Sequence, residues 1–549
     1  MGSVFNKSEL GIKSTRKENL AKDLFDLYKT KKEKLFDEIN GSYNLAIWDG
    51  ESRQFVLSRD HLGIEPLYYF WDEKKLIFAS SIKMLLRHSE VKAEIDFDSL
   101  NTYLLFNYNP RPQSVIAKVK KLRAGFYLKF TSGNLKAERY WYLSFKMGEE
   151  TTEHQVVEAL LPLMKKSINI RLSNTDRQGA FLSGGMDSSS VVGLMSSMVQ
   201  EKIHTFSFRC QGKSFDESHY ANIVSCRYNT EHHLVEFSPQ EILSIGEIVA
   251  SMDEPFCDIG IEVASYLLGR AAQDKVDYVL TGDGGDELFA GHPVYQADGV
   301  AKKFSRMPRP LQKMITSVFS LFPDTDKKKS FAVKAQRFAY SFGFPEELFS
   351  NRWRIYYQQS ELMKLFQPEF YNQHQKANPL DDIISVYNEA DGENFLSKTL
   401  YGDYFTVVNF YLRRMQLLRS FNIQGRFHML DPRLIEFAAK IPASLKLRGA
   451  ATKYILHKTM TGILPDEIVF RKDKLGHSVP FKNWLREVPE IKTFISDTLS
   501  ESTIKKRGYF NYNFVQKLLN EHFKRKKNNS QRIWALLVLE LWMQKNIDF

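Results

Sequence analysis

The pattern of apolar and polar positions changes near residue 150 and predicts different structures on either side. Up to about residue 145, short alternating or aromatic-rich segments are separated by turns, which is typical of half-buried strands. The strands that we predict are Tyr43–Trp48, Gln54–Leu57, Leu67–Phe70 and Leu76–Ala79. The first part of the chain should therefore be mostly β structure.

From about residue 149 the apolar positions follow a helical period and then alternate between strand and helix. Residues 156–168 have the spacing of an amphipathic helix. Strand-then-helix units follow at residues 179–199, 204–226 and 278–288. This alternation predicts a parallel sheet with helices on both faces. The chain from about 300 to 549 is rich in helix formers and predicts an all-α extension.

The best candidate for a linker is residues 145–152, where the strand pattern stops and the helical pattern begins. We therefore predict a first domain over residues 1–148 and a second over residues 149–549. A chain of 549 residues has ample length for both. The predicted fold class is α/β, or α+β when the two domains are taken together.

Composition and cysteine usage exclude several classes of protein. Hydrophobic residues make up 43% and charged residues 26%, an ordinary globular balance. No apolar run approaches the roughly 20 residues that span a bilayer, and the start of the chain has no secretory signal pattern. The 3 cysteines are widely spaced, which argues against a disulfide framework. We expect a cytoplasmic protein with no membrane partner.

The net charge of +11 raises the question of a nucleic-acid partner. Much of the excess comes from two local runs, Lys327–Lys329 and Lys524–Lys527, and solvated surface explains such runs better. No zinc-finger or RNA-recognition signature accompanies them. We therefore expect no nucleic-acid partner, while the basic field can attract small anionic molecules.

The stretch from Leu182 to Ser189 reads LSGGMDSS and lies between a short apolar strand and a helix. Two glycines with hydroxyls on either side allow backbone N–H groups and a helix N-terminus to approach a phosphate chain. A Gly-Ser turn without a ligand is the alternative interpretation. A second feature about 100 residues later favours phosphate binding.

This second feature is TGDGGDELF, at residues 281–289, which follows the apolar strand Tyr278–Leu280. Its carboxylates, Asp283, Asp286 and Glu287, would repel one another unless a cation lay among them. Together with Asp187 they could hold Mg²⁺, which prefers oxygen ligands and substrate phosphates. An acidic surface turn is the alternative.

These motifs together resemble those of the asparagine synthetase family, and other segments extend the resemblance over almost the whole chain. In the family's order they are MDEPF (252–256), DPRLIEF (431–437), KLRG with TKY (446–454) and KLGHSVP (474–480). The resemblance implies a remnant of an Ntn-type β-sandwich glutaminase domain, followed by an ATP-pyrophosphatase-like domain with its all-α extension.

The resemblance also implies a reaction in two steps that uses ATP and Mg²⁺. A carboxylate attacks the α-phosphorus to give an acyl-adenylate and pyrophosphate, and an amine nitrogen then displaces AMP to form an amide. Asp187 and Asp286 match the magnesium positions, Lys474 the catalytic lysine, and Asp283 an acid that helps to deprotonate the amine. The residues implied to bind ATP or pyrophosphate are Leu182, Ser183, Gly184, Gly185, Asp187, Ser188, Ser189, Phe208, Thr281 and Gly282.

The N-terminal part departs from the family pattern. Residues 59–69 match a structural motif of the glutaminase domain, but the first cysteine of the chain is Cys210, so no residue matches the family's N-terminal cysteine nucleophile. Ser3 stands where the family has a glutamine-contacting glutamate. We expect that this chain does not hydrolyse glutamine.

The segments near the acyl substrate depart as well. Residues 258–260 read Asp-Ile-Gly where the family has Asp-Ser-Ser, and Gln424 replaces an acid. These changes suggest a carboxylate other than free aspartate, although asparagine synthesis stays open. The alternatives are a cyclase or peptide-modifying ligase that forms a β-lactam or macrolactam with an internal amine, a non-enzymatic ATP-binding regulator, and a thiolating pyrophosphatase acting on tRNA. Expected partners are a small-molecule carboxylate or peptide, an ammonia or amine donor, and a second copy of the chain in a homodimer.

Overall fold

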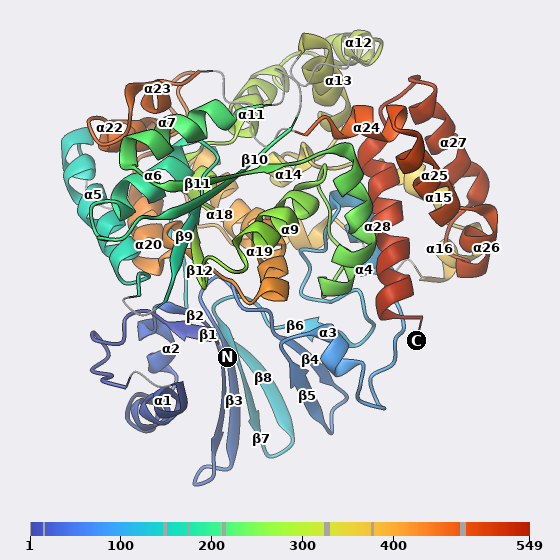
Figure 1. Cartoon of the computed structure of the whole chain (residues 1–549). Coiled ribbons are helices and arrows are strands. Elements are labelled where there is room, and N and C mark those ends of the chain that lie inside the picture. Colours follow the sequence, from blue (N-terminus) through green and yellow to red (C-terminus); the bar gives the residue numbers. More distant parts are fainter. Residues whose placement is uncertain are drawn as a thin grey trace.

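The computed structural model of this protein describes residues 2–14, 17–146, 151–173, 176–210, 216–322, 330–374, 378–472 and 479–548. Antiparallel strands near the N-terminus are followed by a parallel sheet and then by a long series of helices. In Figure 1 the antiparallel strands lie at the bottom, the parallel sheet lies above them, and the last helices lie at the right. The predicted combination of α/β and all-α parts is confirmed.

The N-terminal part contains two antiparallel sheets, with strand orders β1-β2-β3-β7-β8 and β5-β4-β6. Adjacent residues of β3 pack on opposite sides of the first sheet: Val56 packs into a cluster with helical residues, and Leu57 packs against Leu67 and Leu122. Each predicted strand of this part lies at the expected place. The strands are β1 (Gly2–Val4), β2 (Gly41–Asp49), β3 (Gln54–Arg59), β4 (Tyr68–Trp71), β5 (Leu76–Ala79), β6 (Val119–Lys121), β7 (Phe126–Thr131) and β8 (Asn134–Arg139).

The same part also contains helices that the strand pattern did not predict. They are α1 (Lys17–Lys31), α2 (Lys34–Glu38), α3 (Ile82–Leu85) and α4 (Phe97–Phe106). The helix α4 is buried on nearly every side, so its sequence shows no polar face that would reveal a helical period. Its ends are defined by Asp96, which accepts a hydrogen bond from the Ser99 nitrogen, and by Asn107 in the left-handed region.

The second part is built on a parallel sheet with strand order β11-β10-β9-β12-β13. Its strands are β9 (Gln178–Phe181), β10 (His204–Arg209), β11 (Glu231–Glu236), β12 (Tyr278–Thr281) and β13 (Gln424–Phe427). The chain runs outward from β9 to β11 and then returns to β12 on the other side of β9. In open parallel sheets ligands bind beside the carboxyl ends of the strands at such a reversal, here between β9 and β12.

Helices cover both faces of this sheet (Figure 1). The helices α6 and α7 follow β9 and β10, while α9, which leads from β11 back to β12, packs on β10 and β11. The helices of this region are α5 (Glu153–Asn169), α6 (Met186–Met195), α7 (Ser218–Tyr228), α8 (Ile245–Ile248), α9 (Ile261–Ala272) and α10 (Gly285–Phe289). The predicted strand-then-helix units are confirmed.

The rest of the chain is largely helical, as predicted. Its helices are α11 (Pro293–Phe304), α12 (Arg309–Ser320), α13 (Phe331–Ser341), α14 (Phe349–Arg352), α15 (Gln359–Leu365), α16 (Pro368–His374), α17 (Asp381–Asn388), α18 (Phe395–Phe405), α19 (Val407–Gln416), α20 (Pro432–Lys440), α21 (Ala443–Lys446), α22 (Tyr454–Met460), α23 (Asp466–Val469), α24 (Phe481–Glu487), α25 (Pro489–Thr498), α26 (Glu501–Arg507), α27 (Tyr512–Phe523) and α28 (Ser530–Asn546). Within the described residues, no helix combines the length and the apolar character needed to cross a membrane.

The helix α28 joins the two parts of the molecule. The Tyr103 hydroxyl of α4 donates a hydrogen bond to the Ala535 carbonyl at 2.8 Å, and the Trp542 indole nitrogen donates to the Met252 carbonyl at 3.0 Å. Because α28 is buried almost throughout, it forms one hydrophobic core with α4 and α9. The N-terminal sheets are thereby held against the part that carries the parallel sheet.

Candidate active site

The predicted pyrophosphate loop joins β9 to α6 at the carboxyl end of the central strand. Gly184 adopts φ +70°, and a Cβ there would lie 2.5 Å from the Ala221 nitrogen, so this position requires glycine. The Ser188 hydroxyl accepts a hydrogen bond from the Ser183 nitrogen at 3.0 Å and donates to the Gly185 carbonyl at 3.2 Å. The loop is thus held in place beside the first turn of α6, whose N–H groups have no partner within the helix.

The predicted acidic motif follows β12, which pairs directly with β9. The carboxyl ends of the two strands therefore meet at one edge of the sheet, at the reversal of strand order. The contact is close, because a Cβ at Gly282 would lie 2.7 Å from the Asp187 Cβ. The two motifs, about 100 residues apart in sequence, therefore lie side by side at this edge of the sheet.

Asp187 and Asp286 converge on the side chain of Lys453. The lysine ammonium, which is only 3% exposed, forms ion pairs with both carboxylates. Burial opposes its charge, but the two carboxylates raise the pKa of Lys453 well above its ordinary value. Lys453 lies in the matching segment 446–454, but nothing in its local sequence indicates that it is buried against these carboxylates.

The other carboxylates of the acidic motif have separate partners. Asp283 forms an ion pair with Arg414 of α19. Glu287, which is fully buried, contacts the His292 ring nitrogen at 2.8 Å, and the other ring nitrogen lies 3.5 Å from Asp286. Arg414 thus neutralises Asp283, and the His292 ring lies between Glu287 and Asp286; neither partner is indicated by the local sequence.

The donor set around Asp187 fits a magnesium ion. The Oδ1 atom of Asp187 is buried and has no hydrogen-bond partner among the described residues. The other oxygen of Asp187 and the Oδ1 atom of Asp286 already converge on one cationic group. Proteins usually hold Mg²⁺ through one or two carboxylates, with substrate phosphates completing the shell. Asp187 and Asp286 are the residues that would hold the ion.

Leu182 and Phe208 lie at the ends of neighbouring strands. The Leu182 nitrogen donates to the Phe206 carbonyl at 2.9 Å, and its carbonyl accepts from the Ser207 hydroxyl. Both backbone groups of Leu182 are therefore used within the sheet. Phe208 is half-buried, with its ring centroid 6.0 Å from that of Phe237. It lies at the carboxyl end of β10, beside the loop.

Two buried hydroxyl groups complete the predicted set. Ser189, on the first turn of α6, is fully buried, and its Oγ has no hydrogen-bond partner among the described residues. Thr281, the last residue of β12, accepts from the Asp283 nitrogen at 3.5 Å. The structure therefore places all the predicted ATP-site residues that it describes around the ends of β9, β10 and β12.

A residue that the sequence analysis missed contacts the loop from the C-terminal part. Arg471 donates to the Gly184 carbonyl at 3.3 Å, lies 3.6 Å from the centre of the Tyr220 ring, and pairs with Glu217. It is three residues before Lys474 in sequence. Lys474 itself falls in residues 473–478, outside the described residues, so its predicted catalytic role stays a prediction.

Two positions that depart from the family pattern contact each other. The Gln424 amide, at the start of β13, donates to the Ser3 hydroxyl of β1 at 2.8 Å. In the other departing segment, Ile259 adopts φ +40°, which is rare for a β-branched residue. Its neighbour Asp258 accepts from the Gln531 amide at 2.9 Å. The changes thus lie at a junction between the sheets and at a strained turn held by α28.

Glu254 belongs to the segment MDEPF (252–256), one of those that carry the family resemblance, and its side chain links the two parts of the molecule. It is fully buried and accepts from Lys121 at 2.9 Å, Arg413 at 2.8 Å, the Val115 nitrogen at 2.9 Å and the Asn109 amide at 3.1 Å. Burial opposes ionisation, yet Lys121 and Arg413 lower the pKa of Glu254 to about 2. Burial lowers the pKa of Lys121 to about 7, so Arg413 is the permanent counter-charge.

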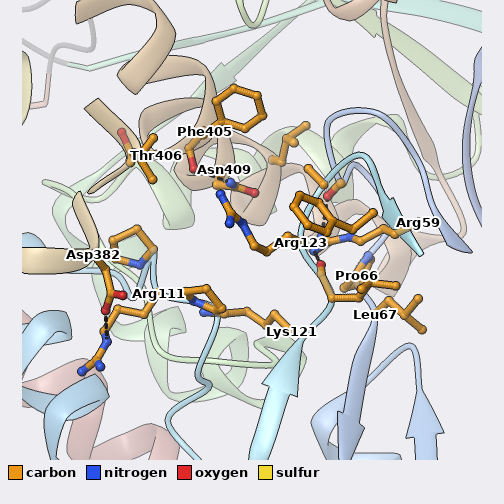
Figure 2. Close-up of a pocket in the computed structure, with 18 of the residues that line it drawn as sticks. Arg59, Pro66, Leu67, Arg111, Lys121, Arg123, Asp382, Phe405, Thr406 and Asn409 are labelled. Carbon is orange, nitrogen blue, oxygen red and sulfur yellow. Dashed lines mark hydrogen bonds and ion pairs between the residues drawn. The ribbon is translucent and has the colours of Figure 1, made fainter. Parts of the chain in front are cut away.

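A cavity of about 160 Å³ lies beside this link, between the N-terminal sheets and α17 to α19 (Figure 2). Its walls are rich in cationic side chains: Arg59, Arg111, Lys121, Arg123, Arg139 and Arg413. Several are neutralised, for example Arg111 by Asp382 and Arg123 by Glu389. None of the described residues of the predicted ATP site lines this cavity, so it is separate from the nucleotide loop.

Two family models match the chain. The model described as asparagine synthase matches residues 159–544, and the model described as glutamine amidotransferase domain matches residues 7–141. The first segment contains the parallel sheet and most of the helical extension, and the second contains the antiparallel strands β2 to β8. The asparagine synthase match includes both of the motifs around β9 and β12.

Curated proteins show the same similarity over most of the chain. The glutamine-hydrolyzing asparagine synthetase 1 of Bacillus subtilis strain 168 is 28% identical over 535 residues, which cover 96% of this chain and 80% of that protein. The glutamine-hydrolyzing asparagine synthetase 3 of the same organism is 24% identical over 488 residues, covering 84% and 72%. Amidase chry2 of Gibberella zeae is 23% identical over 550 residues, covering 92% and 79%.

Proposed function

Because the chain belongs to the asparagine synthase family, we propose that it is an ATP-dependent amide synthetase that activates a carboxylate as an acyl-adenylate. The observation that supports this most is the convergence of Asp187 and Asp286 on one point beside the glycine loop. Carboxylates repel a polyphosphate unless a cation lies between the two groups. When bound there, Mg²⁺ would neutralise charge on the pyrophosphate leaving group.

In the first step, an oxygen of the substrate carboxylate forms a bond to the α-phosphorus of ATP, and the bond from that phosphorus to the bridging oxygen of pyrophosphate breaks. The residues of this chain orient and stabilise the leaving group. Gly184 lets the backbone pass close to it, the first turn of α6 presents N–H groups, and Ser183 presents an exposed hydroxyl. Lys453 keeps the two carboxylates in position.

In the second step, an amine nitrogen forms a bond to the acyl carbon, and AMP leaves with the oxygen that came from the carboxylate. The nitrogen must lose a proton, and Asp283 is placed to accept it. Asp283 lies next to Arg414 at the end of β12, and its side chain is 10% exposed. The guanidinium would hold the carboxylate in one orientation towards the nitrogen.

For the substrate, we propose a carboxylate other than free aspartate, with ammonia or an amine as the nitrogen donor. The substituted residues near the acyl segment support this, as do the contact between Ser3 and Gln424 and the strained Ile259. The same observations favour, as a second candidate, a cyclase or peptide-modifying ligase that uses an internal amine. If the substituted residues do not alter the choice of carboxylate, the product is asparagine, formed from aspartate.

We also propose that the domains meet near residue 148. The matched segments, which end at residue 141 and begin at residue 159, support this division. Assembly into a homodimer stays a prediction.

The experiment that tests the proposed function is ATP–pyrophosphate exchange, screened against aspartate, glutamate and carboxylated peptides without a nitrogen donor. We expect exchange with one class of carboxylate, followed by AMP and amide formation when ammonium is added. Exchange with aspartate alone, followed by asparagine formation, would remove the altered-specificity part of the proposal. Formation of ADP and phosphate instead of AMP and pyrophosphate would contradict the whole proposal.

Lys474 provides a separate prediction. If its ammonium stabilises negative charge only in the transition state of adenylation, Lys474→Ala should lower the maximal rate at least about tenfold and change the KM for ATP only a few-fold. The control is Lys472→Ala, because Lys472 is exposed and two residues away. Equal maximal rates for the two variants would show that Lys474 is an ordinary surface lysine.

A further inference from the structure

Far from the nucleotide loop, two histidines and a glutamate gather at the start of β10 and β11. His204 is the first residue of β10 and pairs in register with Glu231, the first residue of β11. His233 lies two residues after Glu231, so all the side chains are on the same face of the sheet. Phe208 is the fourth residue after His204 on β10, so this end lies roughly 13 Å from the position of Phe208.

The distances between their polar atoms match those of ligands around one metal ion. The Nδ1 atom of His204 lies 3.1 Å from Nε2 of His233 and 3.6 Å from Oε1 of Glu231, and the last two atoms are 3.5 Å apart. Ligand atoms held tetrahedrally at ~2.0–2.1 Å from a zinc ion are roughly 3.3 Å from one another. All the atoms of this cluster are thus already near the positions that such an ion requires.

The surrounding side chains hold this arrangement in place. The His233 ring stacks on Phe206 with centroids 4.9 Å apart and on His204 with centroids 5.4 Å apart. The next histidine, His232, points to the opposite face and contacts the Thr205 hydroxyl at 2.9 Å. The cluster is open to solvent, because the side chains of His204, His233 and Glu231 are 27%, 22% and 54% exposed. An ion can therefore enter from outside, while the ligand atoms need little rearrangement.

We propose that His204, Glu231 and His233 form a binding site for a divalent transition-metal ion, with zinc as the expected occupant. Two imidazole nitrogens and one carboxylate oxygen suit Zn²⁺, Co²⁺ or Ni²⁺ and are a poor set for Mg²⁺ or Ca²⁺, which prefer oxygen alone. Protein ligands fill three positions of a tetrahedron and leave the fourth to water. The site is independent of the magnesium position at Asp187 and Asp286.

The ion would fasten the edge strand to its neighbour. β11 is the outermost strand of the sheet, and the ligands bridge it to β10 at the end where pairing begins. The helix between these strands, α7, carries Tyr220 and Ala221, which pack against Gly184 of the nucleotide loop. Metal binding would therefore stabilise the β10-α7-β11 unit that supports the loop, without taking part in the chemistry.

The test uses the full chain after treatment with a chelator, titrated with Zn²⁺ alone and with Co²⁺ as a spectroscopic probe. We expect the wild-type protein to bind one more equivalent of Zn²⁺ than the double variant His204→Ala/His233→Ala, and to give the visible absorption of tetrahedral Co²⁺ that the variant lacks. Glu231→Gln should lower the zinc affinity at least about tenfold, since losing even a residue that only hydrogen-bonds to a metal ligand costs about that much. Zn²⁺ should raise the melting temperature of the wild type but not that of the double variant.

The matched control is His154→Ala. His154 is an exposed histidine that pairs with Glu158 at 3.2 Å and, among the described residues, belongs to no cluster of possible metal ligands. This variant should keep the full zinc stoichiometry and the melting shift. Equal zinc stoichiometry in the wild type and the double variant, or a zinc-independent melting temperature in the wild type, would overturn the proposal. Equal melting temperatures of all variants in chelator would show that the lost binding does not come from misfolding.

Discussion

Replacing Asp286 by asparagine is expected to lower carboxylate-dependent AMP formation at least about 100-fold, and Asp187→Asn should have a similar effect. One ligand of a hard ion contributes several kcal/mol of leaving-group stabilisation, and about 1.4 kcal/mol corresponds to a factor of ten in rate. Each change also removes half of the negative charge that faces the buried ammonium of Lys453. The measurement is the initial rate of AMP release at saturating ATP.

A control for this experiment lies at the other end of the same strand. Asp277 immediately precedes β12 and forms a largely exposed pair with Arg177, so Asp277→Asn should leave the rate within a few-fold. Melting temperatures of all the variants separate a loss of chemistry from a loss of folding. Near-normal rates for both Asp187→Asn and Asp286→Asn would remove these residues from the site.

Replacing Glu254 by glutamine is expected to destabilise the protein by about 3–5 kcal/mol at pH 7, because it leaves the buried guanidinium of Arg413, with Lys121 beside it, without the shared carboxylate. Glutamine keeps the size of the side chain, so packing should change little. Thermal unfolding provides the measurement. Glu241→Gln is the control, because its partner Arg270 is half exposed and such surface pairs contribute about 1 kcal/mol or less.

The pH dependence of this difference follows from the pKa of Glu254. Its folded-state pKa of about 2 lies below the ordinary value of 4.5, so the stabilisation by ionised Glu254 is complete above about pH 4.5. It decreases as the pH falls towards 2, and a shift of this size corresponds to roughly 3 kcal/mol. The melting temperatures of the wild type and Glu254→Gln should therefore converge in acid. A difference that is the same at pH 3 and pH 7 would show that Glu254 is not an ionised link.

The sheets and the nucleotide loop could be predicted from the sequence because their signals are local. The strand at Gln178–Phe181 is short, and the glycines that follow it within a hydroxyl-rich loop are typical of a close approach of the backbone to another group. Tyr278–Thr281 is likewise a short apolar strand that is followed by a turn rich in glycine and acidic residues. The order of the strands reverses between β9 and β12, so the carboxyl ends of these two parallel neighbours lie together.

What could not be predicted depends on partners that are distant in sequence. Lys453 is 266 residues from Asp187, and Arg414 is 131 residues from Asp283, so no local pattern indicates either pair. The helix α4 was missed for a different reason: it packs against α28 on one side and the N-terminal sheets on the other, which removes the polar face that marks a helix. The role of Glu254 as a link could not be predicted because its partners are also distant in sequence: they come from residues 109–121 and from α19.

The central claim is that a substrate carboxylate attacks the α-phosphorus of ATP. The direct test is to supply the carboxylate identified by the exchange screen with both of its oxygens labelled with ¹⁸O, and to determine the mass of the AMP that is released. If an acyl-adenylate forms, one labelled oxygen remains on the amide product and the other appears in AMP, in proportion to product. Labelled oxygen in inorganic phosphate with unlabelled AMP would contradict the account, because it would mean that the carboxylate attacks the γ-phosphorus instead.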